Sequence, residues 1–217
     1  MKHLLMVLAL CCTGLPGKAD TGRLIQIQYT NPGLIPAQWT LVLHPDGSAH
    51  FTSERGNAPR EHPGGIEAPN QNIDVQLSAE FAHHVFQIAQ RKRLFREQCE
   101  SHLKVAFQGT KTLTYEGPDG QGSCAFNYSK DADIQSLGDS LVSGATPLIE
   151  GARLEMLLQH DPLGLDKETE ELVEMAADGR VRQIGSIRGI LERLAGDDDV
   201  LERVRKRAQT LLDEAHD

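Results

Sequence analysis

The chain has 217 residues and a formal net charge of −9 at pH 7. Nucleic-acid-binding proteins concentrate positive charge, so this acidity argues against a nucleic-acid partner. The length allows one or two domains. No segment approaches the ~20 consecutive apolar residues that a membrane-spanning helix needs, so we expect no integral membrane segment in the mature protein.

Residues 1–19 have the pattern of a secretory signal peptide. Lys2 supplies the positive charge, and Leu4–Cys12 forms a short apolar run. Gly17 and Ala19 are small residues at the −3 and −1 positions, which predicts cleavage after Ala19. We therefore expect an exported protein, periplasmic or extracellular.

Four cysteines bear on this prediction. Cys11 and Cys12 lie at the end of the apolar run, where a lipidated cysteine would stand, so a lipid-anchored form is an alternative. Cleavage leaves Cys99 and Cys124, and two cysteines in an exported chain favour a disulfide. Two free thiols or half of a metal site are the other readings, although zinc usually takes four ligands.

The first predicted element is a β-hairpin over Thr40–Thr52. Its turn is Pro45–Gly47, in which proline, aspartate and glycine each have the favoured turn chemistry. If His44 pairs with Ser48, one face of the hairpin is apolar and the other mostly polar. The apolar face would consist of Leu41, Leu43, Ala49 and Phe51.

The middle of the chain predicts a loop, a helix and three strands. Glu54–Asn72 is rich in Pro, Gly and Asn and is expected to be a disordered or mobile surface loop. Ser78 is expected to cap a helix that ends near Lys92. Alternating apolar residues predict a meander of three strands, at Leu103–Gln108, Lys111–Glu116 and Ser123–Ser129.

The last part of the chain is expected to be helical. A helix capped by Ser129 is predicted at Asp131–Ser143, and Thr146-Pro147 marks a boundary between an α+β domain, residues 20–146, and an α-helical region, residues 147–217. Apolar spacing there predicts two helical hairpins, with helices at Leu148–His160, Lys167–Ala177, Arg182–Ala195 and Val200–Ala215.

The predicted fold class is thus α+β, with a small antiparallel sheet made of a hairpin and a three-stranded meander, two helices, and an all-α tail. The layout resembles a group of exported bacterial proteins of unknown function. The residues that carry this resemblance are Lys104–Phe107, Gly109–Gly117 and Cys124–Ser129. Val204–Ala208 also resembles the second helix of a HEAT-type repeat. The first resemblance implies the fold and no activity.

One motif suggests ester hydrolysis. Gly138–Leu141 spells the nucleophile block of GDSL esterases, and Asp213 and His216 give the Asp-x-x-His of that family. Ser140 would attack the ester, His216 would take its proton and Asp213 would orient the imidazole. However, the apolar stripe continues through the motif, which places Ser140 on a helix. The Gly and Gly-x-Asn-Asp blocks that supply oxyanion donors are missing between Ser140 and His216.

The histidines suggest a metal site as a second catalytic reading. His44 and His50 share a face of the predicted hairpin, diagonally at roughly 7–8 Å, and His62 in the following loop could approach them. Zinc would require closer convergence, so we expect surface histidines, no metal and no cofactor.

The sequence therefore favours an exported, non-catalytic binding or scaffold protein that contacts a protein partner through its helical tail. The alternative is a secreted hydrolase, either an esterase through Ser140 and His216 or a metal-dependent enzyme through His44, His50 and His62. Neither the ligand nor the oligomeric state follows from the sequence.

Overall fold

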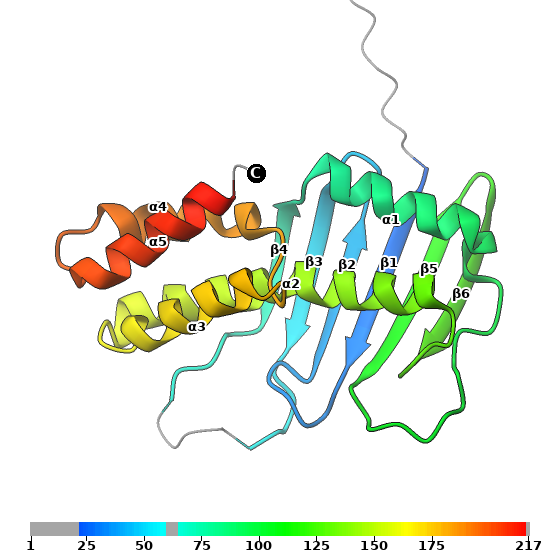
Figure 1. Cartoon of the computed structure of the whole chain (residues 1–217), viewed down its shortest axis with the longest axis horizontal. Helices are drawn as coiled ribbons and strands as arrows, with labels where there is room; N and C mark the ends of the chain where they lie inside the picture. Colours follow the sequence, from blue (N-terminus) through cyan, green and yellow to red (C-terminus); the bar gives the residue numbers. More distant parts are fainter. Residues whose placement is uncertain (1–21, 60–64, 216–217) are drawn as a thin grey trace, which may run out of the picture.

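The computed structural model describes residues 22–59 and 65–215. The predicted signal peptide with Cys11 and Cys12, and two of the candidate site residues, His62 and His216, lie outside the described residues. The fold is α+β, as predicted: one six-stranded antiparallel sheet with helices concentrated in the second half of the chain (Figure 1). No helix among the described residues is both long and apolar enough to cross a membrane.

The sheet is larger than the predicted hairpin plus meander. Its strand order is β4-β3-β2-β1-β5-β6, and every neighbouring pair is antiparallel. The strands are β1 (Leu24–Thr30), β2 (Gln38–Leu43), β3 (Ser48–Glu54), β4 (Gln71–Gln76), β5 (Thr110–Gly117) and β6 (Gly120–Phe126). We did not predict β1 or β4, and β1 is the strand that joins the two halves of the sheet.

One face of the sheet is covered by helices and the other is polar. Helices α1 (Ala79–Arg91) and α2 (Ala132–His160) both cross the same face (Figure 1). The strand residues facing them are buried and mostly apolar, as in Ile25, Ile27 and Tyr29 of β1. The opposite face carries rows of threonine and glutamine, such as Thr52, Thr40, Gln28 and Thr112. This alternation is typical of an antiparallel sheet with one solvated face.

The predicted hairpin is confirmed. The backbone N–H of His44 donates to the carbonyl of Ser48 at 2.9 Å, which is the register we expected. The Asp46 carboxylate accepts from the Ser48 N–H at 2.9 Å, and Gly47 has a φ of +85°, a conformation that favours glycine. The predicted apolar face is buried: Leu41, Leu43, Ala49 and Phe51 are at most 5% exposed.

The predicted strand at Leu103–Gln108 is wrong. These residues are irregular, and Leu103, Val105 and Phe107 are exposed rather than packed. The alternation of apolar residues is real, but the segment pairs with no strand of the sheet. Its backbone is bonded instead to side chains: Asn127 Nδ2 donates to the Ala106 carbonyl at 3.1 Å, and the Tyr29 hydroxyl donates to the Gln108 carbonyl at 2.7 Å.

The predicted helix break at Pro147 is also wrong, because α2 continues from Ala132 to His160 with Pro147 inside it. Proline has no N–H for the carbonyl four residues earlier, and its ring pushes against that carbonyl. The carbonyl in question belongs to Ser143, and it accepts the backbone N–H of Arg182 at 2.9 Å. The missing bond is thus replaced by a tertiary one, so the helix continues.

The N-cap of α2 differs from our expectation too. Asp131, not Ser129, caps the helix, and its side chain accepts from the N–H groups of Asp133 and Ile134. Lys92 at the end of α1 donates to the same carboxylate at 2.8 Å. Both contacts favour the ionised carboxylate, so the pKa of Asp131 lies below its usual value.

The helical tail has the predicted paired arrangement with shifted bounds. Its elements are α3 (Leu165–Ala177), the 3-10 turn η2 (Ile184–Ile187), α4 (Arg188–Gly196) and α5 (Glu202–Glu214). Leu191 and Leu194 of α4, and Val204 and Ala208 of α5, are fully buried. The apolar stripes that predicted these helices are therefore covered within the chain itself.

Candidate functional site

An open cavity of about 880 Å³ lies where α2 passes over the start of β5. Four of its lining residues are cationic, Lys111, Lys130, Arg180 and Arg182, whereas Asp139 is the one acidic residue among those described around it. This balance is unusual in a chain whose net charge is −9. The volume is within the range of small-molecule sites.

Lys111 forms the floor of this cavity. It occupies an inward position of β5, in line with the buried residues Leu113 and Tyr115, and it is only 3% exposed. Its ammonium lies 3.5 Å from an Asp139 carboxylate oxygen and 5.7 Å from the centre of the Phe126 ring. Burying a lysine at a position where an apolar residue would fit carries a desolvation cost, and lysines are seldom fully buried without a partner.

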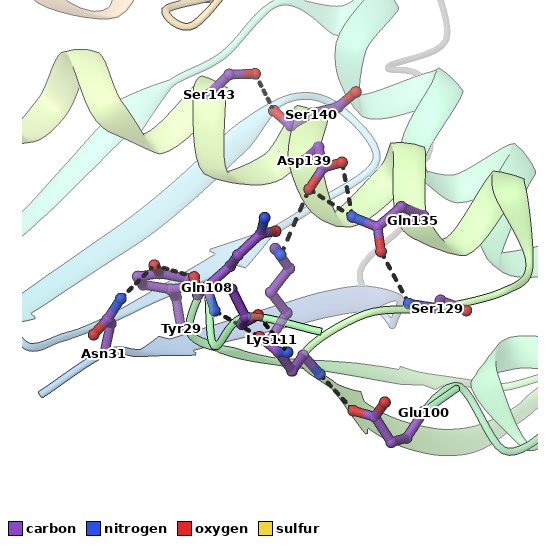
Figure 2. A network of polar contacts seen from close by, with 12 residues as sticks. Tyr29, Asn31, Glu100, Gln108, Lys111, Ser129, Gln135, Asp139, Ser140 and Ser143 are labelled. Atoms are coloured by element: carbon purple, nitrogen blue, oxygen red, sulfur yellow. Dashed lines mark hydrogen bonds and ion pairs between the residues drawn. The ribbon is translucent and has the colours of Figure 1, made fainter. Parts of the chain in front are cut away.

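A short relay of hydrogen bonds holds Asp139 in place (Figure 2). The side-chain amide of Gln135 donates to both Asp139 oxygens, at 3.0 and 2.9 Å, and its own oxygen accepts the N–H of Ser129 at 2.9 Å. The Asp139 side chain remains 57% exposed. Lys111 therefore has an ion-pair partner that water also solvates.

The glycine of the GDSL-like motif, Gly138, has a packing role. A Cβ atom at this position would lie 2.7 Å from the Phe126 ring and 2.8 Å from Cδ of Lys111. Glycine thus lets α2 approach the sheet closely enough to close over Lys111. The next residue, Asp139, is its ion-pair partner.

Ser140 is on α2, as the apolar stripe predicted, and not in a strand-to-helix turn. It lines the cavity, and its backbone carbonyl accepts the hydroxyl of Ser143 at 3.0 Å (Figure 2). Its own hydroxyl has no hydrogen bond to a carboxylate or histidine among the described residues. Asp213 is bonded to Gln209 on α5 at 2.8 Å, and His216 lies outside the described part of the chain.

The histidines of the metal hypothesis have separate partners. His50 Nδ1 lies 2.7 Å from an Asp74 oxygen, whereas His44 Nδ1 lies 3.3 Å from the carbonyl of Arg23. In residues 22–59 and 65–215, no group of three or more His, Cys, Asp or Glu residues is placed to hold a metal ion. His62 lies outside these ranges.

The predicted cysteine pair is joined in the structure. Cys99 and Cys124 form a disulfide with a Cα–Cα distance of 5.7 Å, linking the segment after α1 to β6. Such bonds persist in oxidising compartments, so the disulfide indicates an exported protein.

Residues 101–109, which we call the arm, are fixed beside the cavity from both ends. Asn127 accepts the Gln108 N–H through its side chain at 2.7 Å and donates its own N–H to Glu100 at 2.7 Å. The Tyr29 hydroxyl donates to the Gln108 carbonyl at 2.7 Å (Figure 2). The bond from Asn127 is the main reason why the pKa of Glu100 lies below its usual value.

A second cavity, of about 500 Å³, lies under the other half of α2 and contains a buried carboxyl pair. Arg153 Nη1 lies 3.3 Å from a Glu150 oxygen and 3.1 Å from a Glu168 oxygen. Burial raises the pKa of Glu150 to about 8, and Glu168 adds to this, although Arg153 acts in the opposite direction.

Sequence reasoning missed both cavities. One signal for the first cavity was present in the sequence. Lys111 occupies the same alternating position as the apolar residues Leu113 and Tyr115, but a lysine is ordinarily taken for a surface residue. The sequence did not predict that Arg180 and Arg182 line the cavity. The hydrogen bond from the Arg182 N–H to the Ser143 carbonyl of α2 brings this segment to it. No protein-family model matches this chain, and no curated protein matches it either.

Proposed function

We propose that this chain is an exported binding protein, periplasmic or extracellular, that holds an anionic organic ligand in the cavity beneath α2. The observation that carries the proposal is the buried ammonium of Lys111 at the floor of an open cavity. Charge-assisted hydrogen bonds to a carboxylate or phosphate are stronger than neutral ones, above all where water is partly excluded.

The cavity rim supports the same ligand chemistry. Lys130 and Arg182 are exposed at the rim, and Arg180 is held by Asp178 at 2.7 Å. Tyr29 and Ser136 add hydroxyl groups to the lining. Cations around hydroxyl donors suit a ligand that carries both negative charge and polar oxygens.

The helical tail remains a second surface for a protein partner, as the sequence analysis suggested. The buried stripes of α4 and α5 are already covered within the chain. A partner would therefore meet charged groups, such as Arg203 and Arg207, that already contact Asp166. Exposed ion pairs contribute little binding energy, which is why we favour the cavity.

Titration calorimetry with citrate and with inorganic phosphate at matched ionic strength tests the proposal. We expect at least one of these anions to bind the wild type, and Lys111→Met to weaken it about 10- to 100-fold, the equivalent of a lost charge-assisted hydrogen bond. Arg182→Gln, at the exposed rim, should weaken it less. Lys206→Met on α5, where the side chain is 75% exposed, is the matched control and should bind as wild type.

The absence of any heat with both anions would remove the anion-binding proposal. The same protein samples also test the hydrolase alternative. Turnover of a p-nitrophenyl ester that disappears in Ser140→Ala would replace the binding function with the esterase. Zinc in the purified protein that is lost on substitution of His44 or His50 would favour the metal-dependent enzyme.

A further inference from the structure

Three of the seven large apolar side chains that are exposed in the described part of the chain lie on the arm. Leu103, Val105 and Phe107 are 50%, 42% and 59% exposed, and they alternate along an irregular segment. Leu34, which is 46% exposed, lies in the connection between β1 and β2. Soluble proteins expose single apolar residues often, but a group of them at one place indicates an interaction site.

These residues lie at one end of the strands, in the connections that follow β1 and precede β5. β1 ends there at Thr30, and β5 begins opposite it at Thr110, as their register shows. The connection that carries Leu34 and the arm therefore leave the sheet at the same end of the strands (Figure 1).

The arm presents its apolar side chains from a fixed backbone. Its first half follows the Cys99–Cys124 disulfide, and the Ser101 N–H donates to the Tyr128 carbonyl at 2.9 Å. Its second half is bonded to Asn127, as described above. A segment fixed in this way loses little conformational entropy when its side chains become buried.

Positive charge accompanies the apolar group. Lys104 lies between Leu103 and Val105, and Lys130 is exposed on the rim of the cavity that Gln108 also lines. Nearby acidic groups are engaged: Asp131 and Asp133 both pair with Lys92. Glu100 accepts hydrogen bonds from the backbone of Asn127 and His102.

We propose that the arm docks on a membrane surface that contains anionic lipids, inserting Leu103, Val105 and Phe107 among the lipid chains while a lipid phosphate enters the cavity above Lys111. The binding of a lipid phosphate in the cavity rests on the proposed function, whereas the insertion of the arm does not. A bilayer accepts a small apolar tip flanked by cations, and each Lys or Arg near an anionic surface strengthens binding about fivefold. Stable protein interfaces bury roughly 800 Å² per partner, more than three half-exposed side chains offer.

Cosedimentation of the mature protein with vesicles measures this docking. We expect binding to phosphatidylglycerol–phosphatidylcholine vesicles and much weaker binding to phosphatidylcholine alone. The triple variant Leu103→Ser, Val105→Ser, Phe107→Ser should lose at least ~10-fold in partition, given the apolar area removed. Leu163→Ser is the matched control, because Leu163 is 76% exposed but lies outside the arm, and it should bind as wild type.

A single substitution provides a readout that does not depend on the stability of the triple variant. In Phe107→Trp, brominated lipids should quench the new tryptophan, whereas the only native one, Trp39, is 3% exposed and should be quenched little in the wild type. Absence of quenching, or equal loss of binding in Leu163→Ser, overturns the docking proposal. So does a triple variant that loses self-association on light scattering instead of vesicle binding.

The two proposals can fail separately. If citrate and phosphate bind through Lys111 but vesicles do not sediment the protein, the arm does not dock and the cavity serves a soluble anion. If vesicles bind through the arm and Lys111→Met changes neither vesicle nor anion binding, the cavity proposal is wrong and the docking stands on the arm alone.

Discussion

Glu150 is expected to make the protein less stable as the pH rises. Its side chain is 12% exposed and shares Arg153 with Glu168, and burial raises its pKa from 4.5 to about 8. The folded state therefore holds the proton more tightly than the unfolded state. The stabilisation is fully present below the ordinary pKa of 4.5, and it is lost as the pH rises to the folded value near 8.

The raised pKa corresponds to a difference of up to about 5 kcal/mol between the protonation states, which is an upper bound because water can enter the adjoining cavity. In Glu150→Gln the neutral amide replaces the carboxyl, and Arg153 keeps its contact with Glu168. Urea unfolding at pH 5, 7 and 9 should show the variant gaining free energy of unfolding over the wild type by several kcal/mol between pH 5 and pH 9.

The control for this experiment is Glu155→Gln, on the same helix, where the carboxylate pairs with Arg193 near the surface. Its difference from the wild type should change little with pH, since exposed pairs contribute little. If Glu150→Gln and the wild type differ by the same free energy at pH 5 and pH 9, Glu150 is ionised throughout this range and the argument from burial is refuted.

Three further changes test how the structure holds the cavity together. Replacing both Cys99 and Cys124 by Ala should lower the free energy of unfolding by about 3 kcal/mol, because the disulfide joins residues with a sequence separation of 25. Urea unfolding curves of the variant and the wild type that superimpose would contradict this. Gly138→Ala should cost about 1–3 kcal/mol by the same measurement, because its Cβ overlaps the residues beneath α2; unchanged stability would mean that the helix does not lie so close. Pro147→Ala supplies an N–H that competes for the Ser143 carbonyl. The backbone amide of Arg182 should therefore exchange its hydrogen faster, as measured by mass spectrometry. An unaltered exchange rate would show that the hydrogen bond from Arg182 to Ser143 does not hold Arg182 against α2.

Local sequence patterns determined the elements whose stability is local. The Pro45–Gly47 turn, the Ser78 cap and the apolar stripes of α4 and α5 each depend on residues a few positions apart. Such signals are complete within a short window, which is why these elements were predicted, although the bounds of α4 and α5 are shifted. The pairing of Cys99 with Cys124 followed from composition and compartment.

Alternating apolar residues did not predict strands correctly where strand formation depends on a neighbouring strand. Leu24–Thr30 alternates as clearly as the predicted strands and should have been recognised as β1. Leu103–Phe107 also alternates and is no strand, because its backbone is bonded to side chains such as that of Asn127 and not to a neighbouring strand. An alternating pattern shows that a segment could place its side chains on the two faces of a sheet. Whether it forms a strand depends on the neighbouring segments with which it packs.

The candidate site belongs entirely to the tertiary structure. Lys111 is buried because β5 lies under α2, and Arg182 reaches the cavity because Pro147 leaves the Ser143 carbonyl free for it. These residues are far apart in the chain, and their contacts arise only when the helix crosses the sheet. Sequence alone determined the short-range turns, caps and stripes, whereas folding decided which charges became buried together, since desolvation depends on what surrounds a group in space.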